Sequence, residues 1–357
     1  MRSFSAKLLL ALLAVVLTLG CFEIAFRALD YRGFHNARAR DWPNRRTPPE
    51  HRVPGLPIKY RPGFEFRFVY DGDPRGYFDP DATLTFRGNK HGHRGPDFSA
   101  RKPEGVYRIV VLGDSFTFGE GVRLEHIFTT RLGEALGERV GEQVEVINAG
   151  TGSWGTAEEV RYLEQRVLGW DPDLVVLVFV PNDANYAAGL DIFDDFREVY
   201  EPPPGWLRRS WVLSFAYSRI RRELAGRHYI DELAALSAGP DKSIRRKWKR
   251  AFDQLGEAAS RVRASQARFA IVMFPFMYRL DDSYPLRTIH ERVEARAAEL
   301  EVPYLDLLPA FAGERYSDLW VHPSDQHPNE NAHAIAASAI ADFLISEDLL
   351  TEPESSR

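Results

Sequence analysis

Residues 108–119 read Arg-Ile-Val-Val-Leu-Gly-Asp-Ser-Phe-Thr-Phe-Gly, a short apolar run that ends in a glycine turn. A run of this length bounded by a turn is typical of a buried parallel strand, so we predict a strand over 108–112. Gly113 permits backbone angles that other residues avoid, and Ser115 follows it on a tight strand-to-helix turn. Open parallel sheets form their sites at the carboxyl ends of the strands, which is where this hydroxyl lies.

Four more runs of the same kind follow, separated by segments with helical spacing. The predicted strands cover 144–150, 174–180, 269–274 and 303–307, and the predicted helices cover 128–140, 156–168, 244–264, 289–300 and 329–346. Strands that alternate with helices predict a three-layer α/β/α domain with a five-stranded parallel sheet and right-handed crossovers. Between the third and fourth strands, we predict an irregular insertion over about 186–240, which contains three consecutive prolines.

Polar residues follow these strands and suit acyl transfer. Ser115 offers an oxygen nucleophile, and His327, beyond the fifth strand, can take its proton near neutral pH. Asp325 can fix the tautomer of His327 and stabilise the imidazolium. The tetrahedral oxyanion needs preorganised donors. The N–H of Ser115, an N–H in the Gly-rich turn after the second strand, and the amide of Asn182 after the third strand can supply them.

These residues resemble the sequence blocks of the SGNH hydrolases, also called the GDSL esterase/lipase family. Gly113-Asp114-Ser115 matches the first block, residues 148–156 the second, Asn182-Asp183 the third, and residues 325–328 the last. The resemblance covers about residues 106–345. It implies a flavodoxin-like sheet and esterase, lipase, thioesterase or carbohydrate-deacetylase chemistry.

Three positions depart from the family pattern. Ser153 stands where the second block has a glycine whose N–H helps to hold the oxyanion, so we expect Ser153 to be the donor, with Gly152 as the alternative. Val180 stands where the third block, Gly-x-Asn-Asp, has its glycine. The last block has the spacing Asp-x-His, and Ser324 occupies the usual Asp position. The same short spacing is found in membrane-anchored or periplasmic polysaccharide O-acetyltransferases, which keeps acyl transfer to a sugar open.

Other polar residues have simpler interpretations. Asp114 is expected to hydrogen-bond within the turn, and His333 falls inside the closing helix, where a structural role is expected. His322 is a rival for the role of base. The pair His91 and His93 flanks a glycine without a carboxylate at ligand spacing, so we predict no metal site there. No cofactor is predicted.

The N-terminus carries an apolar run from Leu8 to Phe22, preceded by two positive charges. We predict that residues 1–27 form an uncleaved signal anchor that crosses the membrane as one helix. By the positive-inside rule the rest of the chain is exported, into the periplasm if the source is bacterial. A cleaved signal and a lipidated Cys21 are the alternatives.

Composition separates the remaining regions. Residues 28–105 are rich in Pro, Gly, Arg and Asp, and we predict a juxtamembrane arm with short strands near 64–68 and 83–86. The catalytic domain is expected over 106–350, followed by a tail over 351–357. With 46 basic and 51 acidic residues, the formal charge is −5, which disfavours nucleic acid as a partner.

The leading hypothesis from the sequence is a membrane-anchored serine hydrolase. It would remove an acyl group, such as acetyl, from an extracytoplasmic carbohydrate or other ester. An O-acetyltransferase with the same triad is the rival enzyme, because only the acceptor of the acyl group differs. A non-catalytic binding or assembly protein of the cell envelope, on the same fold, is the alternative from another class.

Overall fold

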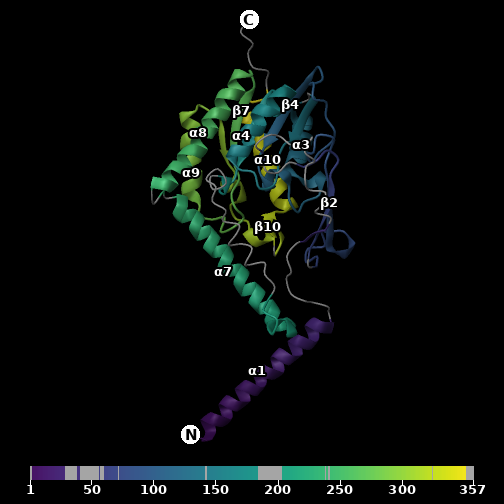
Figure 1. Cartoon of the computed structure of the whole chain (residues 1–357), viewed down its shortest axis with the longest axis vertical. Helices are drawn as coiled ribbons and strands as arrows, with labels where there is room; N and C mark the ends of the chain where they lie inside the picture. Colours follow the sequence, from purple (N-terminus) through teal and green to yellow (C-terminus); the bar gives the residue numbers. More distant parts are fainter. Residues whose placement is uncertain are drawn as a thin grey trace.

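The computed structural model describes residues 2–28, 38–40, 56, 60–70, 72–140, 143–183, 203–237, 239, 242–323 and 325–350. A body with a central sheet stands above a long helical stalk (Figure 1). The stalk consists of α1 (Arg2–Ala28) and α7 (Trp211–Ser237), and α7 continues upward along the body.

The central sheet has five strands, in the order β5-β4-β6-β7-β8, and all neighbouring pairs are parallel. In chain order this is second, first, third, fourth, fifth, the flavodoxin-like arrangement. The predicted α/β fold is therefore confirmed. The strands are β4 (Val106–Leu112), β5 (Gln143–Asn148), β6 (Leu174–Phe179), β7 (Arg268–Met273) and β8 (Tyr304–Asp306).

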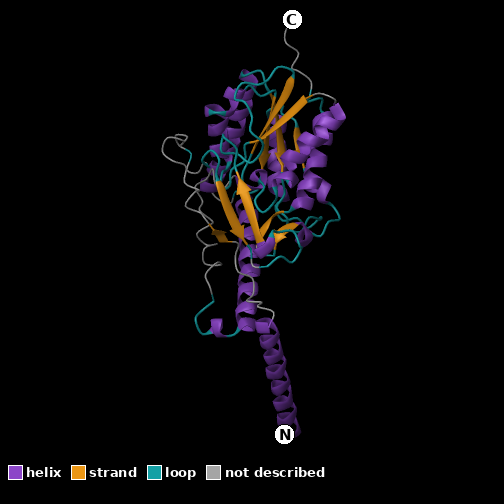
Figure 2. Cartoon of the chain, turned by 90° about the vertical axis from the view of Figure 1, so that its right-hand side faces the viewer, coloured by secondary structure: helices purple, strands orange, loops and turns teal. Residues whose placement is uncertain are grey.

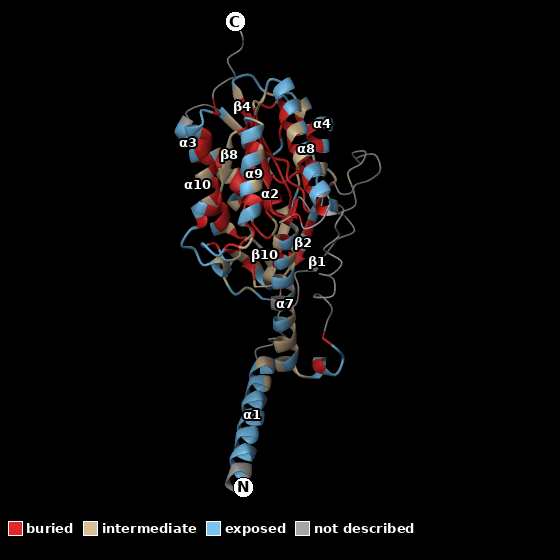
Figure 3. Ribbon diagram, turned by 90° about the vertical axis from the view of Figure 1, so that its left-hand side faces the viewer, coloured by how far each residue is buried: buried red, intermediate tan, exposed pale blue. Residues whose placement is uncertain are grey.

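Helices cover both faces of this sheet. One face carries α3 and α10, which contact each other, and the other carries α4, α8 and α9 (Figure 3). A strand that is covered by helices on both faces needs apolar side chains on both faces. The central strand β6 shows this, because it is buried at every position. The helices are α3 (Phe128–Val140), α4 (Thr156–Gln165), α8 (Lys242–Ala264), α9 (Arg287–Glu299) and α10 (Glu330–Ser346).

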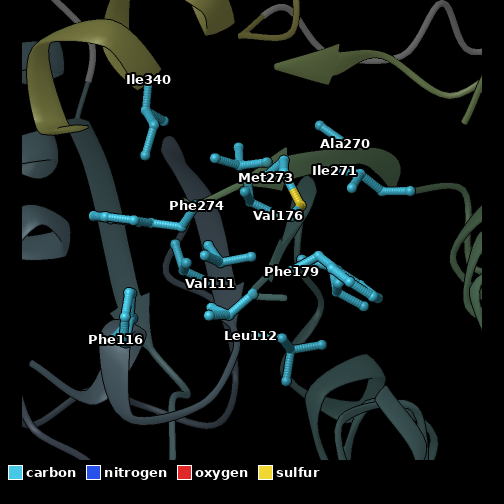
Figure 4. Close-up of a cluster of buried hydrophobic side chains, with 14 of the residues drawn as sticks. Val111, Leu112, Phe116, Val176, Phe179, Ala270, Ile271, Met273, Phe274 and Ile340 are labelled. Carbon is cyan, nitrogen blue, oxygen red and sulfur yellow. The ribbon is translucent and has the colours of Figure 1, made fainter. Parts of the chain in front are cut away.

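The core lies between these layers. Figure 4 shows side chains of β4, β6 and β7 meeting Phe116 and Phe274, with Ile340 of α10 above them. Phe116 directly follows the predicted nucleophile. Its ring packs edge-on against that of Phe274, with the ring centroids 5.3 Å apart. The turn that carries Ser115 is thus fixed to the centre of the sheet.

A second cluster joins the N-terminal region to this body. β2 (Glu65–Val69) and β3 (Thr83–Arg87) pair antiparallel, and β1 (Arg38–Arg40) adds to their sheet (Figure 2). The strands alternate buried and exposed residues, as predicted for the runs 64–68 and 83–86. Their inward aromatic rings pack on Phe118, which lies in the short helix α2 (Ser115–Phe118). The domain boundaries themselves stay a prediction.

The prediction of an irregular insertion over 186–240 is wrong for its last part. Residues 211–237 form one continuous helix, α7, while residues 184–202 lie outside the described residues. The sequence hides this helix because its apolar residues do not keep to one face. Ile230 and Leu233 are buried near its end, whereas Ile220 and Leu224 are exposed in its middle.

Candidate active site

The nucleophile candidate sits on a tight turn between β4 and α2. Asp114 caps α2, because its carboxylate accepts the N–H of Phe116 at 2.8 Å. A side chain at Gly113 would place its Cβ 2.2 Å from Oγ1 of Thr117, so only glycine fits there. Asp114 thus has the structural role in the turn that the sequence predicts, and Ser115 begins the helix.

The three predicted catalytic residues meet at this turn. Oγ of Ser115 lies 3.0 Å from Nε2 of His327, a distance at which the hydroxyl can donate its proton to the ring. Nδ1 of the same ring lies 2.6 Å from Oδ1 of Asp325. Both residues come from β10 (Asp325–Pro328), which pairs antiparallel with β9 (Trp320–His322). Residues separated by more than 200 positions therefore form one continuous hydrogen-bonded chain.

The second carboxylate oxygen of Asp325 is also bonded, which the sequence did not reveal. The hydroxyl of Tyr70 donates to Oδ2 of Asp325 at 3.2 Å. Tyr70 is buried at the end of β2, and its ring stacks on Phe78 with the ring centroids 4.1 Å apart. The alternation over 64–68 predicted a strand, but nothing in the sequence linked that strand to Asp325. The N-terminal region thus supports the candidate site directly.

Charge in the site favours the protonated imidazole. Burial opposes the charge of His327, but the carboxylates of Asp325, Glu120 and Asp114 outweigh it and raise the pKa of His327 to about 10. Burial also opposes the charge of Asp325, whose pKa is nevertheless lowered by His327 and by the bond from Tyr70. An ion pair at the site is the arrangement that this charge distribution stabilises.

The predicted oxyanion donors differ in how deeply they are buried. Gly152 is buried beside it, since a Cβ on Gly152 would lie 3.9 Å from Cβ of Ser115. Ser153 is exposed and holds a left-handed backbone, with φ at 67°. Asn182 is buried, and its side chain bonds to Asp114. Its side-chain oxygen has no hydrogen-bond partner among the described residues.

Two further carboxyl groups lie buried behind these donors, and the sequence analysis missed them as a pair. Neither side-chain oxygen of Glu159 has a hydrogen-bond partner among the described residues. Asp183, next to Asn182, accepts the N–H of Val180 at 2.7 Å. Burial and the charge of Asp114 raise the pKa of Glu159 well above its usual range, and burial with the charge of Glu159 does the same for Asp183. Both carboxyls therefore favour their neutral forms.

The other histidines take up different positions. His322 is buried beneath Tyr70, with ring centroids 5.5 Å apart, while His327 is the histidine that contacts Ser115. Nδ1 of His333 accepts the N–H of Phe128, and burial lowers the pKa of His333 to about 3. That histidine is structural, as the sequence predicts.

The histidine pair before β4 bonds to protein groups. Nε2 of His91 lies 3.0 Å from the carbonyl oxygen of Phe98, and Nε2 of His93 lies 2.6 Å from the hydroxyl of Tyr162. Trp154 is fully buried and packs against Tyr162. Ser324, at the family's usual Asp position, lies outside the described residues.

A flavodoxin-like sheet with a serine turn after its first strand is the arrangement expected of the SGNH hydrolases. The chain belongs to the GDSL-like lipase/acylhydrolase family, whose model matches residues 111–335. It is therefore a hydrolase that acts on ester bonds. Comparison with curated protein sequences gives no match.

Solved structures similar to this chain include TesA, a mutant of Axe2 and EstA. The crystal structure of TesA is 14% identical, covers 66% of this chain and 97% of its own, and has a TM-score of 0.43. A mutant of Axe2, an acetyl-xylooligosaccharide esterase from Geobacillus stearmophilus, is 15% identical, with coverages of 67% and 94% and a TM-score of 0.43. The psychrotrophic esterase EstA from Pseudoalteromonas sp. is 13% identical, with coverages of 68% and 98% and a TM-score of 0.42.

Proposed function

We propose that the protein removes an acyl group, such as acetyl, from an extracytoplasmic carbohydrate or other ester by a Ser-His-Asp mechanism. The observation that carries this proposal is the chain of hydrogen bonds from Ser115 through His327 to Asp325. The chain connects a hydroxyl, a base and a carboxylate in the order that nucleophilic catalysis requires.

The first half-reaction forms an acyl-enzyme. Nε2 of His327 takes the proton of Ser115 as Oγ attacks the ester carbonyl carbon, and Asp325 stabilises the imidazolium. The N–H of Ser115, an N–H of Gly152 or Ser153, and an N–H of the Asn182 amide bond to the oxyanion. The tetrahedral intermediate then collapses, and His327 gives its proton to the departing alcohol.

The second half-reaction restores the enzyme. His327 takes a proton from water, whose oxygen attacks the acyl carbon, and Oγ of Ser115 leaves with the proton that the imidazolium returns. The products are the carboxylic acid and the free serine. If a sugar hydroxyl replaces water in this step, the same residues transfer the acyl group.

The surroundings of Ser115 favour a small acyl group and a polar alcohol. The closeness of Gly152 to Ser115 leaves little room on that side for a long chain. The carboxylate of Glu120 and the hydroxyl of Tyr60 both lie within 3.6 Å of the position that a Cβ on Gly152 would take. The carboxylate of Glu120 can accept hydrogen bonds from the hydroxyl groups of a carbohydrate.

The N-terminus supports the proposed placement outside the cytoplasm. Within the described part of the chain, Ala6–Ala28 is the helix long and apolar enough to cross a membrane, and its side chains are largely exposed. Arg2 and Lys7 precede its apolar core, which favours a cytoplasmic N-terminus. Cys21 is exposed on this helix.

Hydrolysis of p-nitrophenyl acetate by the full-length protein in detergent tests the proposal. We expect ester cleavage that Ser115→Ala abolishes, while the matched control Ser317→Ala, at an exposed serine, keeps full activity. Addition of a polysaccharide acceptor separates the two fates of the acyl group: free acetate indicates hydrolysis, and acetylated polymer indicates transfer. Equal activity of Ser115→Ala and the wild type would refute the proposed mechanism.

A further inference from the structure

The end of α1 is bonded to the beginning of α7. The carboxylate of Glu23 accepts the N–H groups of Trp211 and Val212 at 3.0 and 3.1 Å, and the hydroxyl of Ser210 at 2.8 Å. The first N–H groups of a helix have no partner within it, and a negative charge there is favourable. Glu23 thus caps α7, and the two helices form a joined corner.

Arg27 completes this corner. Its guanidinium pairs with Glu23 at 2.7 Å, donates to the carbonyl oxygen of Arg209 at 2.7 Å, and lies over the ring of Trp211. The rings of Phe26 and Phe215 pack edge-on beside it, with their centroids 5.6 Å apart. The last turn of the apolar helix is therefore held to α7 by charge, hydrogen bonds and packing together.

The residues beside the corner have the composition of a membrane–water interface. Trp206 is 70% exposed, and Arg208 and Arg209 follow it in the short turn that leads into α7. Exposed Trp with Arg is enriched where a chain meets lipid headgroups. Because Arg27 bonds to the carbonyl of Arg209, this turn lies level with the end of the apolar helix.

The other part of α7 reaches the candidate active site. A Cβ on Gly226 would lie 3.9 Å from Nε2 of Gln326, the residue between Asp325 and His327. Further along α7, Tyr229 stacks on Phe276, which contacts Phe116 beside the nucleophile. Figures 1 and 3 show β10 at the end of the catalytic body nearest α1, with the C-terminus at the opposite end.

One helix therefore sets the distance between the site and the membrane. From Trp211 to Gly226, at a rise of about 1.5 Å per residue, the helix spans about 22 Å. With α1 in a bilayer, the part of α7 that meets Gln326, the residue between Asp325 and His327, lies within about this distance of its surface. The joined corner between α1 and α7 keeps the candidate site at this distance from the bilayer. A flexible tether would let the distance vary.

We infer that the substrate is an ester carried by a membrane-bound molecule, with its acyl group held within about 22 Å of the bilayer surface. This inference rests on the proposed function and on α1 as the anchor. Enzyme and substrate in the same bilayer meet at a high effective concentration, and a fixed working height keeps the site within reach of the ester. The corner formed by Glu23 and Arg27 therefore positions the candidate site relative to a membrane-bound substrate.

The test uses the full-length protein in vesicles of phosphatidylcholine and phosphatidylglycerol. Two acetate esters are compared at equal bulk concentration: free 4-methylumbelliferyl acetate, and an umbelliferyl acetate attached to phosphatidylethanolamine by a short hydrophilic spacer. We expect the lipid-attached ester to be cleaved at least ~10-fold faster by the wild type, because both partners share one surface. Glu23→Ala should remove most of this advantage and leave cleavage of the free ester within about twofold, since α7 loses its cap far from Ser115.

Controls and outcomes separate this inference from the proposed function. Asp253→Ala, which removes an exposed ion pair with Lys249 on α8, should change neither rate. If Glu23→Ala fails to fold, it will not cleave the free ester. Arg27→Met then tests the corner a second time. Cleavage of the free ester with no advantage for the lipid-attached one would overturn the inference, as would an advantage that both corner variants keep. If the wild type cleaves neither the free ester nor the lipid-attached ester, the proposed function itself is refuted.

Discussion

The hydroxyl of Tyr70 donates a hydrogen bond to the carboxylate of Asp325, although the two residues are 255 positions apart. Asp325 bonds to His327 through its other oxygen, so both of its oxygens are held. A strand that precedes the α/β domain thus positions the carboxylate that orients the proposed base. The N-terminal region is part of the candidate site in this sense.

Tyr70→Phe removes this hydrogen bond and keeps the ring. A bond to a charged group contributes about 1.5–3 kcal/mol, so we expect kcat/KM to fall by about 10- to 150-fold. The fall should appear in kcat, because Tyr70 touches Asp325 rather than the proposed substrate position. Steady-state kinetics on p-nitrophenyl acetate measure it. Tyr77→Phe is the control, since the hydroxyl of Tyr77 bonds to His126 and to the N–H of Arg123 instead; equal losses in both variants would contradict the role of Tyr70.

Glu120→Gln tests the electrostatics of the proposed base. Glu120 is one of the carboxylates that raise the pKa of His327 to about 10. Catalysis needs the neutral imidazole, so the activity of the wild type should rise with pH into the alkaline range. Removal of one negative charge destabilises the imidazolium and lowers its pKa, so the acidic limb of the kcat/KM profile should move to lower pH. Glu125→Gln should leave the limb in place, and a limb unmoved by Glu120→Gln would refute this account.

Glu159→Gln tests the buried carboxyls. Burial first, then the charges of Asp114 and Glu158, raise the pKa of Glu159 above its unfolded value of about 4.5. The stability that this group contributes is therefore fully present below pH 4.5 and is lost as the pH rises through the folded pKa. Glutamine does not ionise, so the variant should become more stable relative to the wild type as the pH rises. Thermal unfolding between pH 4 and pH 8 measures the difference; Glu134→Gln on the surface is the control, and parallel curves for Glu159→Gln and the wild type would contradict it.

Phe66→Ala tests the attachment of the N-terminal region. The ring of Phe66 is almost fully buried and packs against Tyr60, Phe64, Phe86 and Phe118. Truncation of a buried Phe costs about 3–5 kcal/mol of unfolding free energy. Urea denaturation measures the loss. Ile345→Ala, at an exposed position of α10, should cost less than about 0.5 kcal/mol, and a similarly small loss at Phe66 would mean that the cluster does not stabilise the body.

The sequence predicted the central sheet well because its strands are buried on both faces. Runs such as 174–180 need no alternation to be recognised, and β6 agrees with that run to within one residue. Ser115 was found because it follows a buried strand and carries a hydroxyl suited to acyl transfer. Asp325 and His327 lie in β10 and were found as an Asp-x-His pair that resembles the last block of the family. The distances among these three side chains depend on how the chain crosses over between strands, which the sequence pattern does not give.

Other features depend on contacts that a sequence pattern does not carry. The helix α7 has apolar residues on several faces, because its beginning meets α1, its end meets the body and its middle is exposed. Tyr70 reaches Asp325 only once the strands of the N-terminal region pack on the domain. Gly152 and Ser153 are neighbours in one turn, and their choice as oxyanion donor depends on the local backbone rather than on residue type.

The central claim is that Ser115 is a nucleophile activated by His327. Labelling of the folded, full-length protein with a fluorophosphonate probe, followed by peptide mapping, tests this claim most directly, since the probe reacts with activated serines. The account predicts one adduct, on Ser115, that is absent from Ser115→Ala and strongly reduced in His327→Ala. Absence of labelling in folded wild-type protein, or an adduct on another serine, would contradict it.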